Sequence, residues 1–271
     1  MTRIQINTLT VDYSEAGSGM PVVFIPGITE LKEAFAFQFR GLQDSYRIIS
    51  YDVHRGLKRS ADYTLDLLVN DLHSLLDALK LSSTAICGHS FGGLIAMRFA
   101  IRFPERTNAL VLVSAFPVSP ESHQERLLGW ISSAGHPFHK SLGTSFKVHI
   151  SRLLGRKTSG VLAMQDQIAA VRAIAVQATK VSRATINQRM RIIQKTNFRP
   201  VLSQIQSPTL VVVGAKDRSF FLSSAQELYE SIPDASLEVV EGSGHFCFLT
   251  RHDQFNAAVD EFLTERLAEI V

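Results

Sequence analysis

A serine, a histidine and an aspartate occupy positions from which they could act as one catalytic group. Ser90 lies at the centre of Gly88-His89-Ser90-Phe91-Gly92, which matches the pattern G-x-S-x-G. A serine hydroxyl is a weak nucleophile, so it needs a general base and a carboxylate that orients this base. His245 and Asp217 are the candidates for these roles, because each closely follows an apolar run of strand length. The chemistry expected is attack of Ser90 on a carbonyl carbon.

The residues around Ser90 have the composition of a tight strand-to-helix turn. An apolar run precedes the motif, an apolar-periodic run follows it, and Gly93 adds a further small residue. Small residues two before and two after the serine leave room for a strained backbone. A helix that begins at once would turn its N-terminal N–H groups toward a developing negative charge. This context favours a functional turn over a glycine-rich turn with an incidental serine, and His89 is interpreted as local packing.

Strand-like and helix-like segments alternate along most of the chain. The expected strands are two edge strands within 3–16, then 21–25, 46–51, 83–87, 108–115, 209–213 and 236–240. The expected helices are 30–42, 65–80, the one that follows Ser90, 222–232 and 253–268. This alternation predicts an α/β fold with a doubly wound, mostly parallel, eight-stranded sheet. Ligands bind at the carboxyl ends of strands in such sheets, so Ser90, Asp217 and His245 should meet at one edge.

Residues 117–200 interrupt the alternation. Their pattern is helical, with a long helix expected near 161–195, so we predict a helical lid inserted after the sixth strand. The core is then formed by residues 1–116 and 201–271. Trp130, Phe138 and Phe146 are candidates for lining an acyl site, although such aromatic residues most often serve packing. His136, His139 and His149 fit no familiar zinc spacing and are interpreted as lid-surface residues.

The predicted lid is strongly basic. It contains 13 Lys and Arg against three acidic residues, a balance of +10, whereas the whole chain carries +3. Two interpretations stay open: a solvated helical surface, or a surface that steers an anionic partner toward the site. Such a partner would be an acyl group on a carrier protein or coenzyme A, or a membrane surface. The candidate residues for this surface are Arg152, Arg156, Lys157, Arg189 and Arg191.

Composition limits the other functional classes. The chain of 271 residues has only two cysteines, Cys87 and Cys247, which disfavours a disulfide framework and predicts two small buried side chains. No window approaches the ~18 consecutive apolar residues of a membrane span. The N-terminal residues have no apolar signal core, so we expect cytoplasmic residence. No motif for nucleic-acid recognition accompanies the basic residues, so a nucleic-acid partner is not expected.

Taken together, these pieces resemble the serine enzymes of the α/β-hydrolase fold, over nearly all of the chain outside the lid. The matching segments are Phe24-Ile25-Pro26-Gly27, Asp52-Val53-His54-Arg55-Gly56, Gly88-His89-Ser90-Phe91-Gly92-Gly93, Gly214-Ala215-Lys216-Asp217 and Gly244-His245-Phe246. The resemblance implies Ser90 as nucleophile, His245 as general base and Asp217 as the residue that orients it. It also implies that the backbone N–H groups of Ile28 and Phe91 form an oxyanion hole. The family commonly has His-Gly where this chain has Pro26-Gly27.

The expected reaction is cleavage of a small-molecule carboxylic ester through an acyl-enzyme, with no cofactor. A serine rather than an aspartate at position 90 argues against the dehalogenase and epoxide-hydrolase branches that share the fold. Three alternatives remain open. They are an esterase or thioesterase acting on a carrier- or coenzyme A-bound acyl chain, a C–C bond hydrolase that uses the same three residues, and a ligand-sensing protein without turnover.

Overall fold

A single mixed sheet runs through the centre of the molecule. In the computed structural model, the described residues are 2–7, 9–53, 62–119 and 176–268. Within them, eight strands form one sheet in the order β1-β2-β4-β3-β5-β6-β7-β8. The pairs β1–β2 and β2–β4 are antiparallel, and all other neighbours are parallel. The predicted doubly wound, mostly parallel eight-stranded sheet is confirmed.

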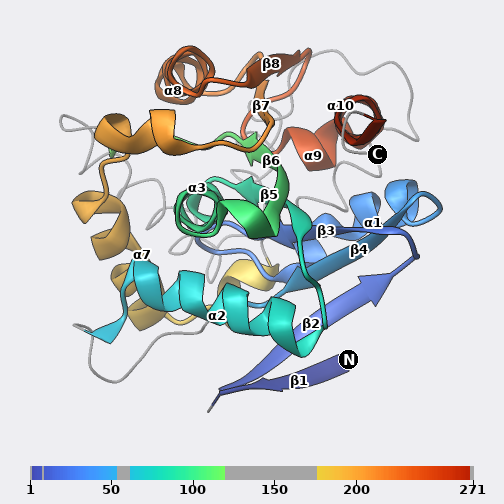
Figure 1. The fold of residues 1–271 in the computed structure, drawn as a ribbon. Helices are drawn as coiled ribbons and strands as arrows, with labels where there is room; N and C mark the ends of the chain where they lie inside the picture. Colours follow the sequence, from blue (N-terminus) through green and yellow to red (C-terminus); the bar gives the residue numbers. More distant parts are fainter. Residues whose placement is uncertain (1, 8, 54–61, 120–175, 269–271) are drawn as a thin grey trace, which may run out of the picture.

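The elements follow the predicted order closely (Figure 1). The strands are β1 Thr2–Ile6, β2 Leu9–Ala16, β3 Met20–Ile25, β4 Tyr46–Tyr51, β5 Thr84–His89, β6 Thr107–Val113, β7 Thr209–Gly214 and β8 Ala235–Val240. The α-helices are α1 Ala36–Leu42, α2 Leu65–Ala78, α3 Phe91–Arg102, α7 Arg183–Lys195, α8 Ser219–Ser231, α9 Cys247–Thr250 and α10 His252–Ala268. Short 3-10 helices are η1 Lys32–Phe35, η3 Pro104–Arg106 and η5 Arg199–Gln204. The helix expected over 30–42 is thus divided into η1 and α1.

Alternate side chains of the central strands enter two separate hydrophobic cores. On β3, Val23 and Ile25 belong to the core beneath α2, α3 and α8, whereas Val22 and Phe24 belong to the core beneath α1, α9 and α10. Both faces of the sheet are covered by helices (Figure 1), so the parallel strands have apolar side chains at nearly every position. The carboxyl ends of β5, β6 and β7 are therefore held in place by a sheet that is packed on both faces.

The described parts of the predicted lid differ from the expected helix near 161–195. A helix that includes 176–180 ends there, and Ser182 begins a new one, α7, by accepting a hydrogen bond from Thr185 N–H at 3.1 Å. Serine favours this capping position because its hydroxyl satisfies an N–H that the helix leaves open. Val118 and Asn197 form an antiparallel bridge, which joins the two ends of the predicted insertion. The boundaries 117–200 stay a prediction, because residues 120–175 lie outside the described residues.

Within the described ranges, no helix is both long enough and apolar enough to cross a bilayer.

The start of α2 provides a test of the fold that is independent of the site. Thr64 accepts a hydrogen bond from Leu67 N–H at 3.1 Å. We expect Thr64→Ala to lower the free energy of unfolding by about 1 kcal/mol, since the N–H group loses its cap. Thr64→Ser should keep most of the wild-type stability. Urea unfolding of the three proteins measures the effect, and equal stabilities of the alanine and serine variants would contradict the assignment of the cap.

Candidate active site

Ser90 occupies a strained turn between β5 and α3. Its backbone has φ 51° and ψ −112°, a conformation that side-chain-bearing residues rarely adopt. The turn is closed by two contacts, from Ser90 N–H to Val113 O and from Gly93 N–H to Ser90 O, both at 2.9 Å. A Cβ atom on Gly88 would lie 2.5 Å from Gly92 O, which explains the glycine at that position. The predicted strand-to-helix turn is therefore present.

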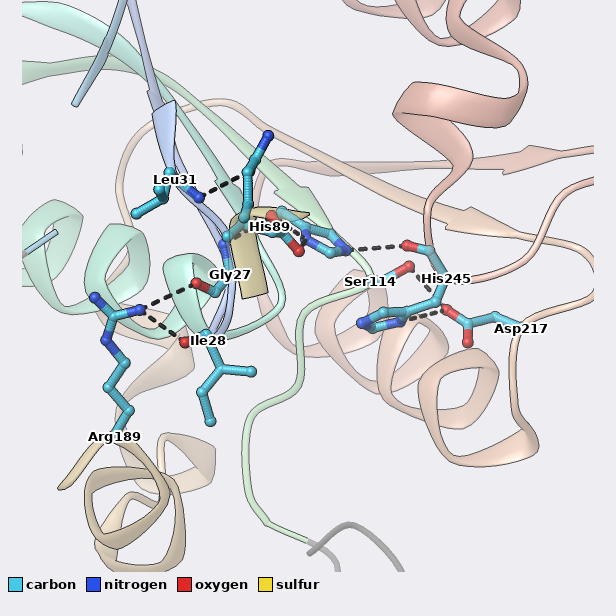
Figure 2. Close-up of polar contacts among 10 residues, drawn as sticks. Gly27, Ile28, Leu31, His89, Ser114, Arg189, Asp217 and His245 are labelled. Atoms are coloured by element: carbon cyan, nitrogen blue, oxygen red, sulfur yellow. Dashed lines mark hydrogen bonds and ion pairs between the residues drawn. The ribbon is translucent and has the colours of Figure 1, made fainter. Parts of the chain in front are cut away.

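Asp217 and His245 are brought together from loops that follow β7 and β8. His245 Nδ1 lies 3.1 Å from Asp217 Oδ2, and both side chains are buried (Figure 2). Asp217 also accepts a hydrogen bond from Ser114 Oγ at 2.8 Å and one from Arg218 N–H at 2.8 Å. Because the carboxylate accepts from Nδ1–H, the imidazole is oriented with Nε2 as the proton-accepting atom.

The partners of Asp217 keep this carboxyl group ionised. Burial by itself would raise its pKa, but the charge of His245, the hydrogen bonds from His245 and Ser114, and the Arg218 N–H outweigh burial. The pKa of Asp217 therefore lies below its ordinary value of 3.8. Ser114 was not predicted from the sequence. It follows β6 with φ 44°, and a lone serine after a strand offers no distinguishing signal.

His89 has a larger role than the local packing that was expected. Its side chain is fully buried, with Nδ1 2.9 Å from Glu30 Oε1 and Nε2 3.0 Å from the backbone oxygen of His245. Glu30 is also buried and accepts a hydrogen bond from Gly27 N–H at 2.9 Å. The pair therefore connects the loop after β3, the turn at Ser90 and the loop that carries His245 (Figure 2).

The two acceptors around His89 determine how many protons the pair holds. The carbonyl oxygen of His245 can only accept, so His89 Nε2 carries a proton. A carboxylate at Glu30 can also only accept, so the pair is either imidazolium with carboxylate or two neutral groups sharing a hydrogen bond. Burial would raise the pKa of Glu30, but the charge and hydrogen bond of His89 and the Gly27 N–H lower it below 4.5. The carboxylate form of Glu30 is thus favoured.

The two expected oxyanion donors lie at the same edge of the sheet. Ile28 follows β3, and Phe91 is the first residue of α3. Within the part of the chain that the structure describes, neither Ile28 N–H nor Phe91 N–H donates to a protein acceptor. First-turn N–H groups have no partner inside their helix, so Phe91 N–H is suited to bind an anion.

One residue of the expected basic surface is not on the surface. Arg189 is 1% exposed, so its assignment to a patch for anionic partners was wrong. It lies on the inner side of α7, where its guanidinium is hydrogen-bonded to backbone oxygens. Arg191, two residues further on, is exposed. The other predicted lid residues lie outside the described residues: Arg152, Arg156, Lys157, Trp130, Phe138 and Phe146.

The two cysteines are poor candidates for a second nucleophile. Cys87 and Cys247 are fully buried, as predicted, and burial raises the pKa of both thiols, that of Cys247 to about 12. Thiolates are therefore scarce at neutral pH. Over the described ranges, no three His, Cys, Asp or Glu side chains gather in a way that would hold a metal ion.

The buried Glu30–His89 pair predicts a pH-dependent stability. Because the pKa of folded Glu30 lies below 4.5, its contribution is full above that pH and is lost as the pH falls through the folded value. Glu30→Gln should therefore lower the free energy of unfolding by about 3 kcal/mol at pH 7, since one partner of a buried pair is removed. The difference from wild type should shrink toward zero as the pH falls through the lowered pKa of Glu30, where its carboxyl group becomes neutral. Urea unfolding at several pH values checks this. Glu105→Gln, at an exposed position, is the control, and a constant difference would contradict the ionised pair.

Comparisons with known proteins agree with this architecture. The family model described as "alpha/beta hydrolase fold" matches residues 20–252. Polyketide synthase ThaQ of Burkholderia thailandensis is 31% identical over 93% of this chain, which spans 12% of that protein. The pimeloyl-[acyl-carrier protein] methyl ester esterase of Nitrosomonas europaea is 25% identical, over 93% of this chain and 98% of the relative. An esterase from Exiguobacterium antarcticum superposes with a TM-score of 0.80 at 20% identity, covering 97% of this chain and 99% of its own. The chain belongs to the α/β hydrolase fold family.

Proposed function

We propose that this protein is a serine hydrolase that cleaves a carboxylic ester through an acyl-enzyme, with Ser90, His245 and Asp217 as its catalytic triad. One observation carries the proposal. Asp217 orients the imidazole of His245 at 3.1 Å, and Ser90 occupies a strained strand-to-helix turn at the same edge of the sheet. The ring centroid of His89, the residue before Ser90, lies 4.8 Å from that of His245, which supports placing nucleophile and base side by side.

The reaction then proceeds in two halves. Ser90 Oγ attacks the ester carbonyl carbon while His245 Nε2 takes its proton. The tetrahedral intermediate collapses, the C–O bond to the alcohol breaks, and His245 gives its proton to the departing alkoxide. Water then attacks the acyl-enzyme, again losing a proton to His245. The carboxylic acid leaves, and the proton returns to Ser90.

The other residues of the site have defined tasks in this scheme. Asp217 stays ionised at neutral pH, so it stabilises the imidazolium that forms in each half-reaction. The N–H groups of Ile28 and Phe91 receive the negative charge that develops on the carbonyl oxygen, a contribution of about 3 kcal/mol per donor. Phe221 packs against His245 with ring centroids 4.3 Å apart and helps to hold the imidazole in place.

A carrier-bound acyl substrate is a second candidate. It is favoured by the relative from Nitrosomonas europaea, whose name states a methyl ester on an acyl-carrier protein. The balance of +10 over residues 117–200 favours the same candidate, because a basic surface attracts an acidic carrier at long range. The proposed surface consists of Arg191, Arg152, Arg156 and Lys157. Of these, only Arg191 lies within the described residues, and it is exposed.

The nucleophile is tested by labelling and turnover. Wild-type protein should react with a fluorophosphonate probe and hydrolyse p-nitrophenyl acyl esters, and Ser90→Ala should lose labelling and about 10⁴-fold or more in kcat. Asp217→Asn should keep labelling but lose about 10³- to 10⁴-fold in kcat, because the imidazole adopts the wrong tautomer. Labelling of Ser90 without turnover of any ester would instead favour C–C cleavage or ligand sensing. Absence of labelling in the wild type would contradict the triad.

The basic surface is tested by its salt dependence. We expect kcat/KM for a carrier-bound acyl ester to fall severalfold between about 50 and 300 mM NaCl, because salt screens charges that are far apart. A neutral p-nitrophenyl ester should show little change. Arg191→Gln should weaken the salt response on the carrier-bound substrate only. Equal salt responses of the two substrates would exclude steering by the lid.

A further inference from the structure

Two side chains from the basic insertion reach the loop that carries an oxyanion donor. We call residues 26–31 the oxyanion loop, since they connect β3 to η1 and contain Ile28. Arg189 on α7 is 1% exposed, and Gln177, in the preceding helix, is 4% exposed. Arg189 donates to backbone oxygens of the oxyanion loop (Figure 2). Gln177 accepts a hydrogen bond from Leu31 N–H in the same loop. The insertion, which was expected to cover the substrate, therefore also supports the loop that contains Ile28.

The guanidinium of Arg189 is bound on several sides. Nη1 donates to Ile28 O at 2.7 Å and more weakly to Gly27 O at 3.5 Å. Nη2 donates to Val53 O at 3.0 Å, and Nε donates to Tyr63 Oη at 3.3 Å. Burial of a cation is costly unless such contacts replace its water shell. A fork of five N–H donors is the side chain best suited to hold several carbonyl oxygens at once.

The short contact to Ile28 O restrains the peptide unit after the Ile28 Cα, and the weaker contact to Gly27 O restrains the unit before it. The carbonyl of Gly27 belongs to the peptide unit before the Ile28 Cα, and the carbonyl of Ile28 belongs to the unit after it. Each peptide unit is planar and trans, so its N–H points away from its C=O. Holding Gly27 O toward Arg189 therefore directs Ile28 N–H to the opposite side of the loop. Positive charge beside that carbonyl also polarises the peptide and makes its N–H a stronger donor.

The same loop is held from its other side. Glu30 accepts from Gly27 N–H, and Gln177 Oε1 accepts from Leu31 N–H at 3.0 Å. The Arg189 guanidinium carbon also lies 5.6 Å from the ring centroid of Phe91, the residue that supplies the other expected oxyanion donor. One arginine thus contacts both residues whose N–H groups would bind the oxyanion.

We propose that Arg189, assisted by Gln177, is a positioning residue of the oxyanion hole. It acts through the Gly27–Ile28 peptide and does not touch the substrate. This inference rests on the proposed function, because it requires that an oxyanion forms at Ile28 N–H. It assigns to α7 a task in catalysis that is separate from any steering by exposed lid arginines.

The test compares Arg189→Met, Arg189→Lys and the control Lys195→Met, at an exposed position of the same helix, in the full chain. For an ester that the wild type hydrolyses, we expect Arg189→Met to lower kcat by about 10- to 100-fold with KM within about threefold, since the loss falls on the transition state. Arg189→Lys should recover only part of this loss, because one ammonium group cannot reach the oxygens of Ile28, Val53 and Tyr63 together. Lys195→Met should leave kcat for the neutral ester unchanged.

A boronic acid inhibitor separates positioning from a general structural role. It forms a tetrahedral adduct on a nucleophilic serine and places an oxygen in the oxyanion hole. Across the variants, its inhibition constant should rise by the same factor by which kcat/KM falls, whereas the affinity for the product carboxylic acid should not change. Equal weakening of both ligands, or an unchanged kcat in Arg189→Met, would overturn the inference.

Gln177→Met provides a second variant in case Arg189→Met does not fold. Loss of one acceptor at Leu31 N–H should lower kcat about two- to fivefold, with the same pattern for the boronic acid. An unchanged kcat and an unchanged inhibition constant in this variant would count against the inference. A wild type that is neither labelled at Ser90 nor active on any ester would instead overturn the proposed function, and the inference with it.

Discussion

The turn at Ser90 is the constraint that places every other part of the site. The chain passes from β5 into α3 through one residue with φ 51°, so the two elements must approach each other almost without a linker. A Cβ atom on Gly92 would lie 2.2 Å from Ile25 O, which shows how closely α3 crosses the end of β3. The loop after β3 therefore cannot be far from Ser90. Proximity of residues 26–31 to Ser90 is a consequence of helix–strand packing and needs no separate interaction.

Beneath this turn, the fold buries polar groups that a hydrophobic core would normally exclude. Glu30 and His89 are 3% and 0% exposed, and their contacts join Gly27 N–H to the carbonyl of His245. Removal of one partner would leave a buried charge unpaired, which costs more than the pair contributes. The network therefore ties three loops into one unit. Loops are usually the variable and mobile parts of a fold, so such ties maintain the geometry of a site built from their ends.

Sequence patterns predicted what is periodic or local and missed what depends on tertiary contact. The strands, the turn at Ser90, and the placement of Asp217 and His245 after β7 and β8 follow from apolar runs and glycine spacing. Ser114 and Glu30 were not identified, because a single polar residue in a loop has no pattern that reveals a distant partner. Arg189 was misassigned for a related reason: on α7 it stands among polar and basic residues, and only packing shows which side faces inward. The single long helix expected near 161–195 failed at Ser182, whose capping role depends on local geometry.

The position of Arg189 changes how the charge of the insertion should be understood. The charge balance of +10 includes every charged side chain of the insertion, whether it is exposed or buried. Arg189 is one of these cations, and it is enclosed by protein. A charge that is buried against a peptide acts over a few ångströms through a medium of low polarity, where mobile ions do not reach. Exposed cations such as Arg191 act across solvent, where the screening length is about 8 Å at physiological salt. Under the two proposals made above, the insertion combines electrostatic effects of different range, one on the orientation and strength of a backbone donor and one on the approach of a substrate. Because salt weakens only the second, the first persists under conditions that abolish steering.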